Sequence, residues 1–277
     1  MPLARATAEF NAIASACLQW SQGDLALSEK VFVHVCDPSR PLTSAADGEA
    51  ESPFLTVESE IDGLMVVTQT CDIRRDCLAR PYVEVCPLVQ VESDALEDVR
   101  KWRRVSLVTT TTLAIQGLAA DLDRVMTVEK SLLATWERTP GCENESEAKR
   151  LAWALGRKRE RFAFPNEFVK FAEKLTARLK AKHGKVSPEG EALQSLEEIR
   201  VSASPSWDGN PTDLMFWFVR KNGTAPGIGK FLPEWLKLVP ADERFTKSDG
   251  VLVFLSEMSA EDYLNSERLD LDHLSLT

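Results

Sequence analysis

The sequence predicts an α+β protein in two parts. A β-rich unit over residues 1–140 follows from four strand-like runs that lie close together between residues 24 and 91. A second unit over 141–277 follows from amphipathic helical spacing between residues 145 and 197 and from three apolar, β-branched runs further along the chain. We therefore expect a small, mostly antiparallel sheet or barrel first, and helices packed on a small sheet second.

The first unit is expected to begin with a helix and to continue in strands. Apolar residues recur at helical spacing from Phe10 to Leu18, and Gly23 provides a stop. Asp62-Gly63 is a hairpin signal between two β-rich runs. The expected elements are a helix over 3–22, strands over 31–36, 54–58, 63–72 and 82–89, a loop over 37–53, and a short helix over 93–103.

The second unit is expected to start after the break at Thr139-Pro140-Gly141. Pro188 directly after Ser187 marks the start of a helix, and Ser259 with Asp262 resembles a capping box. The strongly apolar run over 214–219 predicts a central strand. The expected elements are helices over 145–157, 166–183, 188–197, 231–238 and 259–264, and strands over 199–203, 214–219 and 251–255.

The composition is that of a globular protein. Hydrophobic residues make up 44% of the chain and charged residues 27%, which excludes disorder of the whole chain. No apolar run approaches the ~20 residues that span a bilayer, and the first residues lack the pattern of a secretory signal. Six cysteines in 277 residues do not have the density of a disulfide framework. We expect reduced thiols and a cytoplasmic protein with no membrane contact.

Charge is spread unevenly along the chain. The formal net charge is −10, yet residues 149–185 hold twelve lysines and arginines against three glutamates, a local charge of +9 that leaves −19 for the rest. Such a segment can contact the phosphates of a nucleic acid, an acidic protein partner, or the acidic remainder of its own chain. The residues expected to make this contact are Arg157, Lys158, Arg159 and Arg161.

A group of small polar residues follows an apolar run at residues 63–67. Thr68, Cys71 and Asp72 are the candidate catalytic residues, with Cys71 as a nucleophile. A catalytic thiol needs a lowered pKa, and Arg74, Arg75 and His34 are the groups that could supply it. The alternative is structural: Cys71 as a core residue and Asp72 as a cap that accepts hydrogen bonds from backbone amides in a turn.

The sequence gives little support for a metal or a cofactor. Cys36, Cys71, Cys77 and Cys86, with His34 nearby, lack the paired C-x2-C spacing of a zinc site. Asp72 and Glu84 resemble the acidic half of a nuclease metal site without its lysine. The glycine-rich stretch at 223–230 has the wrong spacing for a phosphate-binding loop. We therefore expect no metal and no cofactor.

Two segments carry a resemblance to known families. Residues 66–73 (VVTQTCDI), followed by 83–89 (VEVCPLV) and later by 161–165 (RFAFP), resemble a group of uncharacterised bacterial proteins. Residues 24–91 more distantly resemble the small barrel of PemK/MazF-type toxins, which are endoribonucleases. That resemblance would give Thr68 and Pro87 the places of residues at the ends of two of the family's strands. The arginine that the family carries before the first strand is absent here, where 61–63 reads Ile-Asp-Gly.

The resulting expectation is a bacterial cytoplasmic interaction or accessory protein of a defence or mobile-element system. An endoribonuclease-like barrel or a cysteine-dependent hydrolase is the first alternative. Nucleic-acid binding through residues 149–185 is the second.

Overall fold

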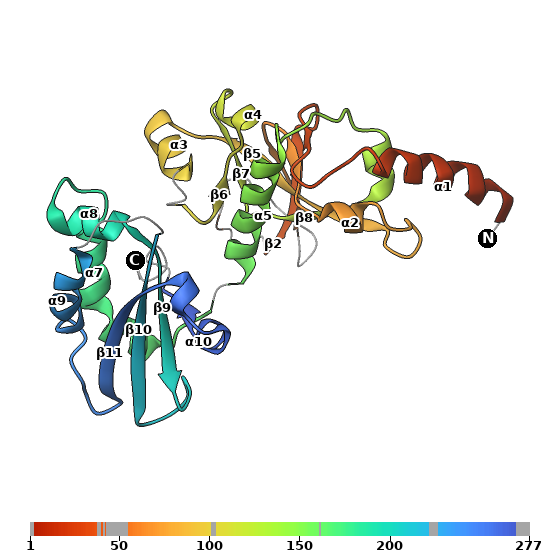
Figure 1. The fold of residues 1–277 in the computed structure, drawn as a ribbon. Coiled ribbons are helices and arrows are strands. Elements are labelled where there is room, and N and C mark those ends of the chain that lie inside the picture. The colour runs from red at the N-terminus through yellow and green to blue at the C-terminus, as the bar shows by residue number, and fades with distance from the viewer. Residues whose placement is uncertain are drawn as a thin grey trace. The chain divides into compact units, whose positions relative to one another are not determined.

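The computed structural model describes residues 3–37, 40, 42, 55–100, 104–160, 162–221 and 227–269. The chain divides into two compact units, Met1–Glu160 (unit 1) and Arg161–Thr277 (unit 2). Both contain helices and sheets, so the α+β class is confirmed (Figure 1). Most of the expected loop over 37–53, the end of the expected helix over 93–103 and residues 223–226 of the glycine-rich stretch lie outside the described residues.

Unit 1 is built on strand β5, the longest strand of its sheet. One edge of β5 pairs with β4, and the other edge pairs first with β8 and then with β7, in each case antiparallel. The order along the sheet is β1-β4-β5-β7-β6, and β2 pairs with β3 in a separate hairpin. The strands are β1 (Leu25–Ala26), β2 (Val31–Cys36), β3 (Leu55–Glu60), β4 (Leu64–Val66), β5 (Tyr82–Gln90), β6 (Leu107–Val108), β7 (Leu118–Asp121) and β8 (Met126–Glu129).

The path of paired strands ends at β1 and at β6 among the described residues. The closed barrel that the toxin resemblance implies therefore stays a prediction. The antiparallel sheet itself agrees with the expectation from close-spaced β-rich runs.

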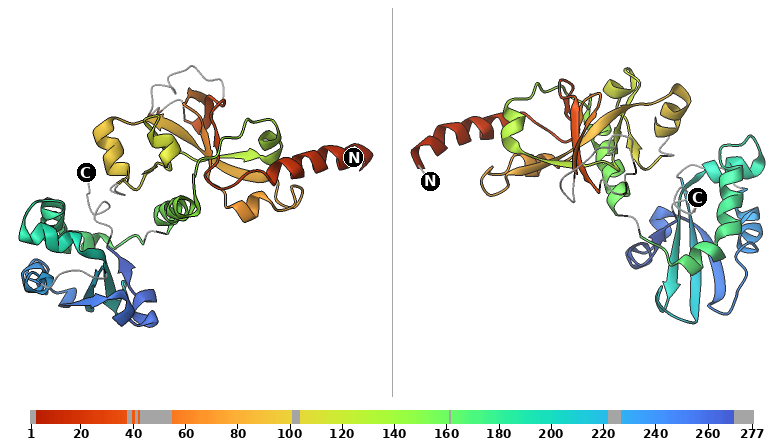
Figure 2. Two further views of the ribbon diagram at one scale, coloured as in Figure 1. Left: turned by 45° about the horizontal axis from the view of Figure 1, so that its top comes forward. Right: turned by 180° about the vertical axis from the view of Figure 1, so that it is seen from behind.

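Unit 1 also contains helices. Figure 2 shows α1 projecting away from the strands of unit 1. The helix ends at residue 17, earlier than expected, and Trp20 after it donates its indole N–H to the carbonyl of Leu133 at 3.0 Å. The helices of unit 1 are α1 (Leu3–Cys17), α2 (Thr70–Ile73), α3 (Ser93–Arg100), α4 (Thr111–Ala114), the 3₁₀ turn η2 (Lys130–Ala134) and α5 (Glu145–Arg159).

Helix α5 belongs to unit 1. Asn144 caps it by accepting a hydrogen bond from the backbone of Glu147 at 3.0 Å, and basic residues fill its last turn, which suits the helix dipole. Leu151 and Leu155 on this helix are buried in a core with Leu25 of β1 and other residues of the sheet. The apolar face of α5 is therefore covered by the strands of unit 1.

The chain before α5 is also fixed to unit 1. Leu25 and Thr139 exchange backbone hydrogen bonds at 2.8 Å in both directions, and Gly141 lies against the carbonyl of Gly23. The break in the sequence pattern at 139–141 is thus a crossing of two backbones within unit 1. The division between the units at 160/161 lies after α5, whereas the sequence analysis placed it at 140/141.

Unit 2 is a four-stranded sheet with most of its helices on one face and α10 (Ala260–Leu264) on the other (Figures 1 and 2). Its order is β11-β10-β9-β12, with β10 parallel to β11 and antiparallel to β9. Leu214, Phe216 and Phe218 alternate along β10 into the main core of the unit, as expected for a central strand. The strands are β9 (Leu196–Ser204), β10 (Thr212–Arg220), β11 (Phe245–Phe254) and β12 (Glu267–Arg268).

The helices of unit 2 begin where the sequence indicates. Ser187 accepts a hydrogen bond from Gly190 N at 3.1 Å with Pro188 in the first turn, and Ser259 accepts one from Asp262 N at 3.0 Å. The elements are α6 (Asn166–Phe171), α7 (Glu173–Lys182), α8 (Pro188–Gln194), η3 (Ile228–Lys230), α9 (Leu232–Leu236), η4 (Leu255–Glu257) and α10 (Ala260–Leu264). In neither unit do the described residues include a helix with the length and apolar character of a membrane span.

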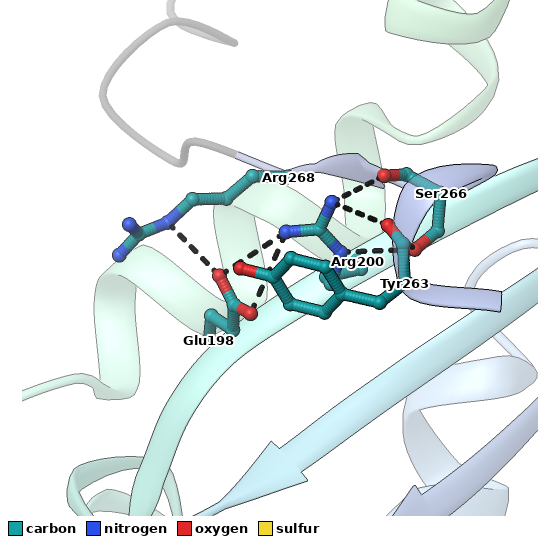
Figure 3. Close-up of polar contacts among 5 residues, drawn as sticks. All are labelled: Glu198, Arg200, Tyr263, Ser266 and Arg268. Carbon is teal, nitrogen blue, oxygen red and sulfur yellow. Dashed lines mark hydrogen bonds and ion pairs between the residues drawn. The ribbon is translucent and has the colours of Figure 1, made fainter. Parts of the chain in front are cut away.

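A cluster around Arg200 fixes the last described segment to the sheet (Figure 3). The Arg200 guanidinium donates to the hydroxyl and carbonyl oxygens of Ser266 and to the Tyr263 carbonyl at 3.0 Å, and it lies 4.0 Å from the centre of the Tyr263 ring. Glu198 accepts from Arg200 at 3.4 Å and pairs with Arg268 at 3.8 Å. Each of the three guanidinium nitrogens of Arg200 is used in this cluster. We interpret the cluster as structural.

Unit 2 should lose stability in acid through one buried carboxylate. The Arg178 guanidinium donates to Glu189 at 2.9 and 2.7 Å and lowers the pKa of that carboxyl group; burial opposes this, and the Trp235 indole at 3.0 Å adds to the lowering. A lowered folded-state pKa gives stability that is present above the unfolded value of about 4.3 and lost as the pH falls through the folded value.

The variant Glu189→Gln is therefore expected to melt at a lower temperature than wild type at neutral pH. Its melting temperature should then change less between about pH 5 and pH 3, where the carboxylate is protonated. Thermal melts of both proteins across this range test the prediction, and parallel curves would contradict it.

Candidate functional site

Unit 1 contains a polar cleft with a volume of 790 Å³. Its walls are the loop after β4, helix α2 with the turn behind it, the first half of β5, Thr127 of β8 and the last turns of α5. Segments far apart in the sequence thus meet here. We call this site the polar cleft.

Three of the residues singled out from the sequence line the polar cleft together. They are Thr68 from the loop after β4, Asp72 from α2 and Arg159 from the end of α5. Glu84 of β5, named for the nuclease pattern, lies there too. The sequence analysis had placed Arg159 in a separate binding segment, so the structure joins two sites that were predicted separately.

Cys71 has a different place. The expected strand over 63–72 is wrong in its second half: β4 ends at Val66, and Cys71 lies on the short helix α2. Cys71 is exposed and is not among the residues that line the polar cleft, and its sulfur lies 3.6 Å from the side-chain oxygen of Gln69. An amide oxygen cannot accept the thiol proton as a general base, so this contact gives no support to a cysteine nucleophile.

Backbone hydrogen bonds hold Thr68 in position. Its hydroxyl oxygen accepts a hydrogen bond from the backbone N–H of Glu84 at 2.6 Å, and the Val67 N–H donates to the Glu84 carbonyl at 2.9 Å. Gln22 supports the same loop by donating to the Val67 carbonyl at 2.8 Å and to the Thr70 hydroxyl at 3.0 Å. Among the described residues, the Thr68 hydroxyl proton has no acceptor, so it can be donated to a ligand.

Charges of both signs line the cleft. Arg75 pairs with Asp72 at 3.2 Å, and Arg159 pairs with Glu84 at 2.6 Å. Both pairs are substantially exposed, so each is worth at most about 1 kcal/mol and can be exchanged for contacts with a ligand. Arg80 is exposed, and no acceptor for its guanidinium lies among the described residues.

Asp72 was expected to cap a turn, but its carboxylate has a different partner in the structure. Its carboxylate pairs with the Arg75 side chain, and among the described residues no backbone amide donates to it. The turn is held from elsewhere: Lys130, with 1% of its surface exposed, donates from Nζ to the carbonyls of Asp72 at 2.8 Å and Arg75 at 3.0 Å. A buried lysine from η2 therefore closes the end of α2 and positions two cleft residues.

The remaining residues of the basic segment do not share one surface of unit 1. Arg157 lines a second, more apolar cavity of 300 Å³, and Lys158 pairs with Asp123. Arg161 lies outside the described residues. Residues 149–185 also cross the division between the units, so the cluster of charge in the sequence is distributed over several places.

The cysteines give no metal cluster in the part of the chain that the structure describes. No group of three or more His, Cys, Asp or Glu side chains that could hold an ion occurs there. All six cysteines are free thiols. Burial raises the pKa of the Cys86 thiol in the core and, with Glu147 and Asp24 nearby, raises that of Cys142 to about 11, so neither is a reactive thiolate at neutral pH.

Arg80 and Tyr82 are among the cleft residues that the sequence analysis did not single out. Both follow α2 in a charged connection that gave no motif, and Tyr82 is 62% exposed at the start of β5. The available signal was a tyrosine two positions after an arginine, at the beginning of an expected strand.

Comparisons with protein-family models, with curated proteins and with solved structures found no match for this chain.

Proposed function

We propose that the chain is a binding protein whose polar cleft takes a short segment of single-stranded RNA. The observation that carries this proposal is the meeting of Thr68, Asp72 and Arg159 in one cleft with Arg75 and Arg80. We also keep as a proposal the role expected from the sequence, that of a bacterial cytoplasmic accessory protein of a defence or mobile-element system. An acidic protein partner is the alternative occupant.

The chemistry of the lining fits the parts of a nucleotide. Arginines bind phosphate oxygens through two parallel hydrogen bonds, and the exposed Tyr82 ring offers a surface on which a base can stack. Asp72 and Glu84 can accept hydrogen bonds from base edges or from a ribose 2′-hydroxyl. Acceptors for the 2′-hydroxyl favour RNA over DNA.

The charge balance predicts selective and moderate binding. Three arginines face Asp72, Glu84 and Glu160 in the cleft, and the whole chain has a net charge of −10. General attraction of polyanions is therefore weak, and affinity depends on local contacts with about three phosphates at most. The logarithm of the association constant should fall with the logarithm of salt concentration with a slope of about −2, since each phosphate on a single strand contributes about −0.7.

The variant Arg80→Gln tests this proposal. It removes a cation that has no acid partner among the described residues, so the fold should be unaffected. We expect about a tenfold loss of affinity and a salt slope smaller by about 0.7. Fluorescence anisotropy with a labelled RNA oligonucleotide at several salt concentrations measures both.

Lys149→Gln is the matched control. It removes one positive charge from the exposed side of α5, where Lys149 pairs only with Glu145 among the described residues, and it should bind RNA as wild type does. A DNA oligonucleotide of the same sequence should bind less well. Equal binding by the two variants, or no binding of RNA by wild type at low salt, would overturn the proposal.

RNA cleavage is a second candidate function, favoured by the same cleft. A carboxylate can take the proton of a 2′-hydroxyl, and an arginine can stabilise the charge that develops on the phosphate. Asp72 and Arg159 are the residues in question, with Thr68 as a hydroxyl donor. Gel analysis of labelled RNA after incubation tests this candidate function. Cleavage that Asp72→Asn abolishes while RNA binding persists would support it. If the RNA stays intact, RNA binding without cleavage remains the proposed function.

A further inference from the structure

The second cavity of unit 1 has a different character from the polar cleft. It has a volume of 300 Å³ and is lined by residues of α3, β6, α4 and α5; Figure 1 labels these four elements. Its inner wall is apolar, with Val99, Val108, Ala114, Leu151 and Ala154 among the lining residues. The size is at the small end of the range for ligand sites of about 300 to 1,000 Å³, so the occupant must be a small molecule.

Four arginines line the same cavity: Arg100, Arg104, Arg150 and Arg157. We call it the arginine-rimmed cavity. Arg100 also pairs with Glu97 at 2.9 Å, an exposed pair of the kind that contributes little. Four cations around one apolar space are unusual in a chain with a net charge of −10, and they point to an anionic ligand group.

The one acidic residue in the lining, Glu147, is held by hydrogen bonds from the protein itself. One Glu147 oxygen accepts from the Thr111 backbone at 2.6 Å and from its hydroxyl at 2.9 Å, and the other accepts from Glu143 N at 2.8 Å. Partial burial opposes the ionised form, but these hydrogen bonds, together with the charge of Arg150, outweigh it and lower the pKa of Glu147. The carboxylate thus joins α4 to α5 and shapes the wall of the cavity.

We propose that the arginine-rimmed cavity binds a small organic anion: a carboxylate, phosphate or sulfonate group carried on an apolar body. The apolar body would lie against the inner wall, and the anionic group would meet the guanidinium groups at the rim. Bidentate hydrogen bonding by arginine suits each of these anions. The proposal is independent of the RNA proposal, because none of the four arginines lines the polar cleft.

A pair of fluorescent probes tests the charge requirement. Anilinonaphthalene sulfonate carries a sulfonate on an apolar ring system, and phenylnaphthylamine has a similar apolar body without charge. The sulfonate probe should bind with saturation at one molecule per chain, at least about tenfold more tightly than the neutral probe. Equal affinity of the two probes would overturn the proposal.

Variants locate the binding in this cavity. Arg104→Gln should weaken the sulfonate probe several-fold and leave the neutral probe unchanged, whereas Lys149→Gln on the outer side of α5 should affect neither. Ala154→Leu fills the cavity and should weaken both probes. If Ala154→Leu lowers the melting temperature, the effect of Arg104→Gln on the two probes still decides whether they bind in this cavity. Binding that no variant alters would be non-specific and would refute the site.

Competition separates this site from the polar cleft. A medium-chain fatty carboxylate should displace the sulfonate probe, and the labelled RNA oligonucleotide should not. Since the probe also binds partly unfolded chains, near-ultraviolet circular dichroism must first show fixed tertiary packing. Displacement by RNA with no effect of the carboxylate would place the probe in the polar cleft and overturn the inference.

Discussion

Replacing Gly141 with alanine is expected to lower the free energy of unfolding of unit 1 by about 3 kcal/mol, near the upper end of the usual cost of overpacking. A Cβ at this position would lie 1.8 Å from the carbonyl oxygen of Gly23 and 2.9 Å from its carbon. Both contacts are with backbone, which cannot rotate away as a side chain can. Accommodation therefore requires moving the crossing at which Leu25 and Thr139 exchange hydrogen bonds.

Gly156→Ala is the control for this substitution. Gly156 lies inside α5, and the nearest atoms to a Cβ there belong to the Glu160 side chain at 3.9 Å. Alanine in a helix interior is better than glycine by about 0.5–1 kcal/mol, so this variant should be more stable than wild type. Urea denaturation followed by circular dichroism measures both. A Gly141→Ala protein as stable as wild type would mean that the backbones do not cross this closely.

Lys130→Met is expected to cost about 2 kcal/mol and to loosen helix α2. Methionine keeps the length of the chain but removes the three N–H donors, which leaves the carbonyls of Asp72 and Arg75 without their partner. Amide hydrogen exchange should accelerate first at Ile73 and Arg74, whose N–H groups bond within α2.

The exposed substitution Lys149→Met provides the comparison, because surface changes are usually within about 0.5 kcal/mol of wild type. The RNA affinity of Lys130→Met should also fall, since Asp72 and Arg75 are in the turn that Lys130 holds. Unchanged exchange at Ile73 together with wild-type stability would contradict the role assigned to the buried lysine.

Elements that depend on local chemistry could be predicted from the sequence. Strand β2 begins and ends at the expected residues because its β-branched run is bounded by charged and turn residues. The start of α8 follows from the serine cap and the proline after it. The central place of β10 follows from its apolar alternation, which suits a strand with neighbours on both edges.

Elements that depend on distant partners could not be predicted. Helix α2 has four residues, too few for a helical period, and its end is held by a lysine that follows it by 58 positions. Strand β1 has two residues and exists through its pairing with β4. The strand expected over 63–72 therefore ran too far: β4 ends at Val66, and helix α2 begins at Thr70.

The candidate site was predicted in parts. Thr68 and Asp72 were found because polar residues directly follow an apolar run, and Arg159 was found because of local charge. That these three line one cleft depends on the packing of α5 against the sheet through Leu151 and Leu155. Nothing in the spacing of the sequence relates the end of this helix to the loop after β4.

Helix α5 forms a wall of the polar cleft and of the arginine-rimmed cavity. Arg150, Ala154 and Arg157 line one, and Ala152, Gly156 and Arg159 line the other. If one ligand shifts this helix along or about its axis, it changes the wall that the other ligand contacts. Thermodynamic reciprocity then fixes the result: whatever factor the organic anion applies to the RNA dissociation constant, RNA applies to that of the anion. A titration of RNA into protein with and without the anion, and a titration of the anion into protein with and without RNA, must give the same factor.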